Sequence, residues 1–348
     1  FSYRKSSVGY TGSASGSSFM TMTAAAGASI SSMDVTVDAL ATFNVKLTNT
    51  FAVTDADTAV VGGALPINAG ALTLGASGVT VNLANGDTLN EVAAKINSVK
   101  LQSNVEASII KVSDGNYRLS LKTLQTGTAQ NYALSGASSA LFTMGFASNV
   151  AAVDAQITLD GTTVVTRHSN SFSDVVPDLT FNLIKKTDAG EKLTVDVSAD
   201  QDQLVTAITN FANTYNNFRV FVSQQTELDD AGKPKDTAVL ASSSTLRSIG
   251  SRISTEIAGI IDGITGGDPN RLADIGLKFT DFAGDTTNPA TRNIIEIDDA
   301  KLRSSIASNF DAVRRVFQFD YTTDDPNISV FSRNNSLAVS DVTLSINT

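Results

Sequence analysis

The stretch that decides the fold is "DQDQLVTAITNFANTYNNFRVFVSQQT", residues 200–226. Its apolar side chains recur at alternating steps of four and three, namely Leu204, Ile208, Phe211, Tyr215, Phe218 and Val222. A seam sustained for about three heptads predicts a helix that packs lengthwise on other helices. Asn213, Asn216 and Asn217 place polar groups close to the seam, where such groups fix the partner or the register more than they add stability.

The chain after residue 226 supplies elements on which this helix can pack. "SSSTLRSIGSRISTEIAGII" (242–261) predicts a second helix with one apolar side, made of Leu246, Ile249, Ile253, Ile257 and Ile260. "IIEIDDAKLRSSIASNFDAVRRVFQF" (294–319) predicts a short strand and two amphipathic helical turns, which Asp298 and Asn309 can cap. We expect Arg314 and Arg315 to face outward and the apolar residues inward, namely Leu302, Ile306, Val313, Val316 and Phe317.

The chain before residue 200 is rich in patterns typical of strands. "MDVTVDALATFNVKL" (33–47) alternates apolar and polar residues, which indicates strands with one buried face. Hairpins are predicted over 71–83 and 105–123, and between them Thr88 and Glu91 have the spacing of a capping box that opens a short helix. Residues 151–200 repeat this pattern loosely, with a helix again expected at "SFSDVV" (171–176). Residues 1–30 are interpreted as extended, loosely ordered chain that needs contacts with neighbouring elements to hold it in place.

Composition excludes several classes of function. Of 348 residues, 42% are hydrophobic and 17% are charged, which favours a folded chain over disorder. A net charge of −10 argues against nucleic-acid partners and against docking on anionic lipids. The lack of cysteine excludes disulfides, thiolate metal sites and a cysteine nucleophile. No apolar run is long enough for membrane insertion, and the opening "FSYRKSSVGY" is expected to belong to an internal fragment.

No catalytic, cofactor-binding or metal-binding residue can be selected, so we predict that the protein is not an enzyme and needs no cofactor. His168, the only histidine, lies in the polar stretch "TRHSNSF" and is interpreted as a loop residue. The acidic pairs at 229–230, 298–299 and 324–325 lack the spacing of a calcium loop and are interpreted as caps and turns. Glycoside hydrolysis needs only two carboxylates, so a polysaccharide-cleaving enzyme stays as a weak alternative.

Several stretches together resemble the flagellar filament cap proteins, the hook-associated protein 2 family. "RLADIGLKF" (271–279) and "IIEIDDAKLRSSIASNFDAVRRVF" (294–317) look like the C-terminal signature of that family. "MTAAAGASISSMDVTVDALAT" (22–42), "GDTLNEVAAKINS" (86–98) and "DAQITLDGTTVVTRHSNSFSDVVPDLTFNL" (154–183) are similar to its other motifs, in the right order. The chain departs from the family at Asp178, where Gly is usual, and over 321–348, which alternates like strands and suggests an extra β element.

The resemblance implies an α+β multidomain fold, in which a helical leg of coiled-coil-like antiparallel helices and short strands carries two small β-rich heads. The leg is expected at 1–46 with 200–348, the inner head at 47–70 with 151–199, and the outer head, inserted in the inner one, at 71–150. The seam residues named above, with Leu246, Ile249, Ile253, Leu302, Ile306 and Phe317, are the candidates for packing and assembly.

The resemblance also implies a role. It is that of a secreted structural protein that forms a homo-oligomeric ring at the filament tip and promotes the folding and insertion of flagellin. Implied partners are flagellin, the hook-associated junction proteins and an export chaperone bound through a C-terminal segment missing here. The implied export route is the flagellar type III secretion apparatus. A surface adhesin or glycan-binding β-module protein is the alternative from another class.

Overall fold

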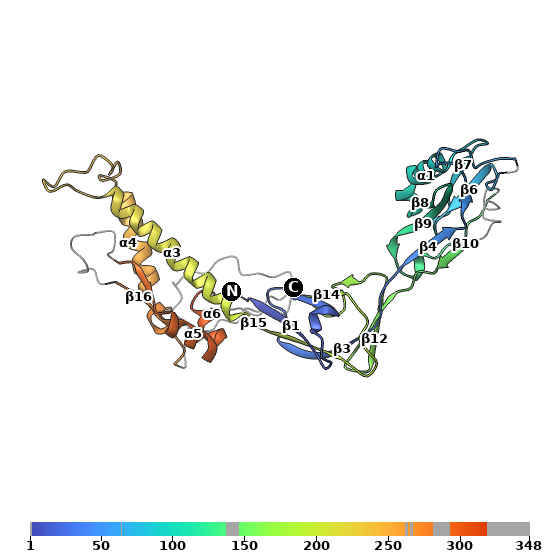
Figure 1. Cartoon of the computed structure of the whole chain (residues 1–348). Coiled ribbons are helices and arrows are strands. Elements are labelled where there is room, and N and C mark those ends of the chain that lie inside the picture. The colour runs from blue at the N-terminus through green and yellow to red at the C-terminus, as the bar shows by residue number, and fades with distance from the viewer. Residues whose placement is uncertain are drawn as a thin grey trace, which may run out of the picture. The chain divides into compact units, whose positions relative to one another are not determined.

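A computed structural model describes residues 2–63, 65–136, 146–261, 264, 267–280 and 293–318. Contacts divide the chain into two compact units: unit 1, Phe1–Lys5 with Ala199–Thr348, and unit 2, Ser6–Ser198. Figure 1 traces the elements, which are mostly helical in unit 1 and mostly strands in unit 2. The expected α+β multidomain class is confirmed.

Unit 1 is built on a long helix, α3 (Gln201–Gln225), which pairs antiparallel with α4 (Ser244–Ala258) (Figure 1). Within the described residues, unit 1 also contains η4 (Leu272–Ile275), β16 (Leu277–Phe279), β17 (Ile295–Ile297), α5 (Asp299–Ser308) and α6 (Phe310–Arg315). β16 and β17 form a two-stranded antiparallel sheet. Their buried side chains and those of α3, α5 and α6 make one hydrophobic core.

The caps predicted at Asp298 and Asn309 are present, and the structure adds a third cap at Asp200. The carboxylate of Asp200 accepts from the backbone N–H of Gln203 at 2.9 Å, that of Asp298 accepts from Lys301 at 3.0 Å, and the side-chain oxygen of Asn309 accepts from Ala312 at 3.0 Å. Each bond satisfies one of the backbone donors that a helix start leaves free.

Unit 2 contains two hydrophobic cores. The first, called the inner core, lies between two sheets and includes Phe19, Val35, Val37, Phe181 and Val195. One sheet has the order β1 (Arg4–Tyr10), β15 (Leu193–Ala199), β3 (Ser31–Ala39), β11 (Ala155–Leu159), β12 (Thr163–Arg167). The other has the order β13 (Ser171–Phe172), β14 (Leu179–Leu183), β2 (Met20–Ala24), and the short helix η1 (Gly16–Ser18) precedes β2.

The second core of unit 2, called the outer core, includes Phe51, Leu72, Leu89, Ile96 and Leu121. Its main sheet has the order β10 (Phe146–Val150), β4 (Phe43–Thr48), β9 (Asn116–Thr126), β5 (Phe51–Ala52), and β8 (Val105–Ser113) also pairs with β9. The hairpin β6 (Gly70–Leu74) and β7 (Val79–Leu83) leads into α1 (Leu89–Ser98), α2 (Lys100–Ser103) follows, and η2 (Thr128–Gln130) comes after β9. The predicted hairpins and the Thr88–Glu91 capping box are both present.

The domain boundaries expected from the sequence differ from these cores. The segment 6–46 was assigned to the leg, but β1, β2 and β3 pair with strands of the inner core and belong to unit 2. The segment 47–70 was assigned to the inner head, but Phe51, Val60 and Ile67 are buried in the outer core. A period of two indicates a half-buried strand without indicating which sheet the strand joins, and this is why both assignments are wrong.

The segment "SFSDVV" does not form the expected helix. It forms the two-residue strand β13 and then a turn, in which the N–H of Leu179 donates to the carbonyl of Val176 at 3.2 Å. Pro177 disfavours helical backbone at the residue before it. Asp178 adopts φ of 62°, the left-handed region that glycine favours, so the tight turn forms without glycine. The strand-like pattern at 321–348 lies outside the described residues.

Candidate functional site

The heptad seam of α3 packs on the rest of unit 1. Leu204, Ile208, Tyr215 and Val222 are buried, while Phe211 and Phe218 are half-buried. The ring of Phe211 meets that of Phe317 edge-on, with centroids 5.6 Å apart, and Tyr215 meets Phe279 in the same way at 5.7 Å. Such edge-to-face pairs add about 0.5–1.5 kcal/mol beyond the area they bury. The burial of these residues is as expected, whereas a role in assembly stays a prediction.

The polar residues beside the seam fix α3 on β17. The side-chain amide of Asn216 makes two bonds to Ile295: its oxygen accepts from the backbone N–H at 2.7 Å, and its nitrogen donates to the carbonyl at 2.9 Å. The hydroxyl of Tyr215 donates to the carbonyl of Asn293 at 2.9 Å and lies 2.9 Å from the hydroxyl of Ser254. These groups therefore set the register between α3, β17 and α4 within one chain.

The side of α4 that packs closely on α3 differs from the predicted apolar side. Its buried residues are Gly250 and Ser254, whereas Leu246, Ile253 and Ile257 are half-buried and Ile249 and Ile260 are exposed. A β-carbon added at Gly250 would lie 3.3 Å from a methyl carbon of Val222. The two helices approach where small residues allow it, and this turns part of the isoleucine stripe toward solvent.

The strand-to-helix segment 293–318 braces the same core. Leu302 and Ile306 on α5 are fully buried, and the turn before them is closed by the N–H of Asp298, which donates to the carbonyl of Gly276 at 2.8 Å. Gly276 has φ of 97°, and a β-carbon there would lie 2.9 Å from the carbonyl oxygen of Asp298. Only glycine fits this approach without strain.

The two arginines of α6 are half-buried, so their expected outward position is wrong. Arg315 forms an ion pair with Asp268, and Arg314 forms one with Asp311 at 3.3 Å. A long arginine side chain can lie along apolar surface while its guanidinium reaches an acid, and the amphipathic pattern does not predict this.

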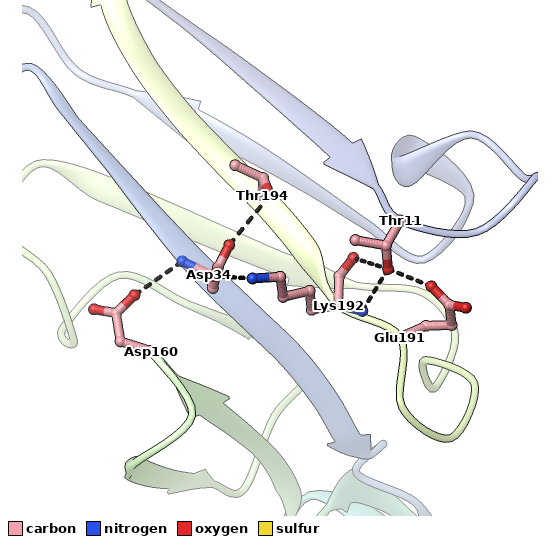
Figure 2. Close-up of polar contacts among 6 residues, drawn as sticks. All are labelled: Thr11, Asp34, Asp160, Glu191, Lys192 and Thr194. Carbon is pink, nitrogen blue, oxygen red and sulfur yellow. Dashed lines mark hydrogen bonds and ion pairs between the residues drawn. The ribbon is translucent and has the colours of Figure 1, made fainter.

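A polar network joins four elements of the inner-core sheet (Figure 2). The carboxylate of Asp34, on β3, accepts hydrogen bonds from the ammonium of Lys192 at 2.5 Å and from the hydroxyl of Thr194 at 3.2 Å. The backbone N–H of Asp34 donates to the carboxylate of Asp160 at 2.9 Å. Thr11, after β1, accepts from the N–H of Lys192 at 2.9 Å and donates to Glu191. The bond from Lys192 holds the pKa of Asp34 below its usual value. These contacts tie the interior of β3 to the start of β15 and the β11–β12 turn, and they tie the start of β15 to the end of β1.

His168 borders a shallow depression that Ser169, Ser171 and Asn182 also line. The hydroxyl of Ser171 donates to Asn182 at 2.6 Å, and the Ser169 hydroxyl accepts from the N–H of Ser171 at 3.1 Å. The carbonyl of His168 accepts from the Thr126 hydroxyl at 2.6 Å. Both hydroxyls thus serve the local backbone and side chains, an arrangement typical of a structural loop.

The acidic pairs within the described ranges act in turns and caps. Asp229 accepts from the N–H groups of Ala231 at 2.9 Å and Lys233 at 2.7 Å, and Asp299 pairs with Arg303 at 2.9 Å. The pair at 324–325 lies outside the described residues. Across the part of the chain that the structure describes, no three His, Asp or Glu side chains gather where they could hold a metal ion. None of its helices has the length and apolar character that crossing a bilayer requires.

Sequence reasoning missed a device that recurs in the described residues. Besides Asn216, three asparagines bind both the N–H and the carbonyl of one backbone residue at 2.7–3.0 Å: Asn97 on Ala107, Asn131 on Ala152 and Asn170 on Ala41. A side-chain amide presents a donor and an acceptor as a peptide group does, so each asparagine replaces a neighbouring strand. Of these four asparagines, the sequence pointed only to Asn216, through its position beside the heptad seam.

Comparison with known families matches two models to this chain. Residues 152–343 match the model described as the C-terminus of flagellar hook-associated protein 2. Residues 67–125, which run from before β6 to the end of β9, match the flagellin hook IN motif. The two matched regions lie in the same order as the motifs quoted above.

Relatives of known identity agree with these models. The B-type flagellar hook-associated protein 2 of Pseudomonas aeruginosa is 28% identical over 280 residues, which cover 74% of this chain and 55% of that protein. The flagellar hook-associated protein 2 of Treponema pallidum is 30% identical over 188 residues, covering 50% of this chain and 26% of that protein. The chain spans about half the length, 55% and 56%, of the two Pseudomonas relatives it matches.

The fold also matches a solved structure. The crystal structure of the D1–D2–D3 domains of the flagellar cap protein FliD from Escherichia coli superposes with a TM-score of 0.63 at 24% identity. The match covers 89% of this chain and 81% of that one. At this identity the likeness concerns the fold alone.

Proposed function

Because the chain belongs to the flagellar hook-associated protein 2 family, we propose that it is a structural subunit of the cap at the distal end of a bacterial flagellar filament. In this role it assembles with further copies of itself into a ring, and the ring guides flagellin subunits into place. Its neighbours are the hook-associated junction proteins, it reaches the tip by the flagellar type III export route, and it performs no catalysis.

One observation carries this proposal. The polar groups beside the α3 seam, Tyr215 and Asn216, bond to Asn293, Ser254 and Ile295, so they fix the shape of unit 1. A protein that guides other subunits must keep its shape under load. The fixed register between α3, β17 and α4 keeps the shape of unit 1 in this way. The exposed Ile249, with the half-buried Leu246 and Phe218, remains a candidate for contact with other subunits.

Labelling of filaments tests the function. An epitope-tagged chain, expressed in cells that lack the gene, should give one focus at each filament tip and restore filament growth. A chain carrying Asn216→Ala is the matched variant and should restore growth less well. A label spread evenly over the cell surface would contradict the cap role and favour a surface adhesin.

A further inference from the structure

The strand β8 has an edge that is closed along one half and open along the other. In a regular antiparallel ladder, residues alternate between pointing both backbone groups at the partner strand and pointing both away. The ladder between β8 and β9 is regular from Val105 opposite Thr123 to Lys111 opposite Tyr117. Residues 105, 107, 109 and 111 of β8 therefore share one direction, and 106, 108 and 110 share the other.

Two side chains identify the direction that points away from β9. Asn97 bonds both the N–H and the carbonyl of Ala107, at 2.8 and 2.9 Å, and the hydroxyl of Ser103 accepts from the N–H of Val105 at 3.2 Å. These groups cannot belong to the β9 ladder, so residues 109 and 111 also face outward. Within residues 65–136, no hydrogen bond reaches the outward groups of Ile109 or Lys111.

The open half of the edge is also apolar. Ile110 and Val112 are 43% and 53% exposed, and their β-branched side chains suit a paired strand. Lys111 is neutralised by Asp114 at 2.6 Å. Natural proteins usually protect such an edge with charge, a bulge or a covering element, because unpaired backbone groups beside apolar side chains attract another strand. Within the described residues, the side-chain bonds to the outward backbone groups of β8 stop after Ala107, and the ladder stays regular to Lys111 before its register shifts between Lys111 and Ser113.

A second open edge lies in the other core of unit 2. β12 is the last strand in its sheet and pairs on one side only, with β11. Val164 on β12 is 57% exposed. Among the described residues, the only side chain that bonds the backbone of this strand is that of Arg167, which donates to the carbonyl of Thr166 at 2.8 Å. Arg167 is in turn neutralised by Asp174 at 2.9 Å. This edge, like that of β8, is β-branched and carries no net charge.

We propose that the open half of β8, residues 109–112, pairs with the free edge of β12 on a second copy of this chain. The inference rests on the proposed function and names the surface through which the ring forms. A head-to-tail ring requires each subunit to present two different surfaces, and the two edges supply them. Two copies with a charge of −10 each repel overall, so contact is favoured where each surface is locally neutral.

Single-cysteine variants test the pairing cleanly, because the chain has no cysteine of its own. Ile110→Cys and Val164→Cys are mixed and treated with a short bifunctional maleimide. We expect dimers from the mixture, little product from either variant alone, and a ladder of multimers from the double variant. Leu101→Cys, at an 84% exposed site on α2 beside the closed half of the edge, is the control for chance collisions. Adding Val112→Lys to the Ile110→Cys variant keeps the reactive cysteine and should abolish its product with Val164→Cys.

Three results would overturn the pairing. Dimers from Ile110→Cys alone, as abundant as those from the mixture, would show that β8 pairs with itself. Product no greater than from Leu101→Cys, while light scattering still shows oligomers of the full chain, would place the ring contact elsewhere and leave the cap role standing. Product at that level together with no oligomer at any concentration, and no tip label in cells, would refute the cap role as well.

Discussion

The side chain of Asn216 bonds both backbone groups of Ile295, so its replacement tests directly how α3 is held on β17. Replacing it by Ala removes two hydrogen bonds and leaves the N–H and the carbonyl of Ile295 without partners. Each bond contributes about 1 kcal/mol net, and each partly buried group left unpaired costs about 1 kcal/mol or more. We expect Asn216→Ala to lower the free energy of unfolding of unit 1 by about 2–4 kcal/mol.

Asn216→Asp separates the two bonds. The carboxylate still accepts from the N–H of Ile295 but faces its carbonyl oxygen, so the folded state favours the protonated acid and raises its pKa above the unfolded value of about 3.9. A raised folded pKa gives stability that is present below the unfolded pKa and lost as the pH rises through the folded pKa. Asn216→Asp should therefore approach the wild type in acid and fall behind it near pH 7.

The assay is amide hydrogen exchange of the peptide that contains residues 293–300, because it reports on unit 1 without assuming that the whole chain unfolds in one step. Asn217, the next residue on α3, is exposed and provides matched controls, Asn217→Ala and Asn217→Asp. The reasoning is refuted if Asn216→Ala protects this peptide as well as Asn217→Ala does. It is also refuted if the two Asp variants show the same pH dependence.

Further predictions concern the outer core. Lys46 is buried, and burial lowers its pKa from the ordinary 10.5. Lys46→Met should therefore raise the free energy of unfolding by about 1 kcal/mol at pH 7, and this gain should shrink as the pH rises toward 10.5. Thermal unfolding measured across this pH range checks the prediction. Burial also raises the pKa of Tyr132, whose hydroxyl has no partner in the described ranges, so Tyr132→Phe should leave the melting temperature equal or higher. Gly75→Ala should cost about 2–4 kcal/mol in denaturant titrations, because φ is 70° and a β-carbon would lie 1.9 Å from the carbonyl oxygen of Ser103. Gly78→Ala, at φ of 68°, should cost about 1 kcal/mol, because its β-carbon would make only an ordinary contact with a methyl carbon of Thr73 at 3.9 Å.

Local signals made unit 1 predictable. The seam of α3, the caps at Asp298 and Asn309 and the short strand before α5 each depend on residues within a few positions of one another. Helical periodicity is unambiguous over about three heptads, and a capping side chain bonds a backbone group only three residues away. These elements therefore follow from short stretches of sequence without knowledge of the rest of the fold.

Strand partners depend on distant residues, and there the prediction failed. Val35 on β3 lies opposite Leu193 on β15 and Leu159 on β11, more than a hundred residues away in both cases. Val45 on β4 belongs to the same alternating stretch as Val35, but β4 pairs with β9 and β10 in the sheet of the other core. Both residues carry the same local pattern, so only the pairing, which is set by loop closure and packing, separates the two cores.

The packed face of α4 failed for a different reason. The apolar pattern predicts the isoleucine stripe as the contact surface, but Gly250 and Ser254 let the helices approach closely, and Ile249 turns outward as a result. Small residues bury little area and add nothing to an apolar stripe, yet they decide where two backbones can meet. A prediction that weights only hydrophobicity rotates such a helix wrongly.

Asparagines that bond both backbone groups of one residue, called asparagine clamps, lie where the chain passes between the two cores of unit 2. The chain enters the outer core after Ala41 and leaves it after Ala152, and each of these residues has both backbone groups bound by an asparagine, Asn170 and Asn131 respectively. A segment crossing between two sheets has no strand beside it, and its unpaired backbone groups would cost free energy if buried. The amide side chain supplies the missing partner at one residue without extending either sheet. Asn97 is a clamp of the same kind, and it binds the outward backbone groups of β8 at Ala107. Among the described residues, the outward groups of β8 beyond Ala107 have no such clamp, and they form the edge proposed for pairing.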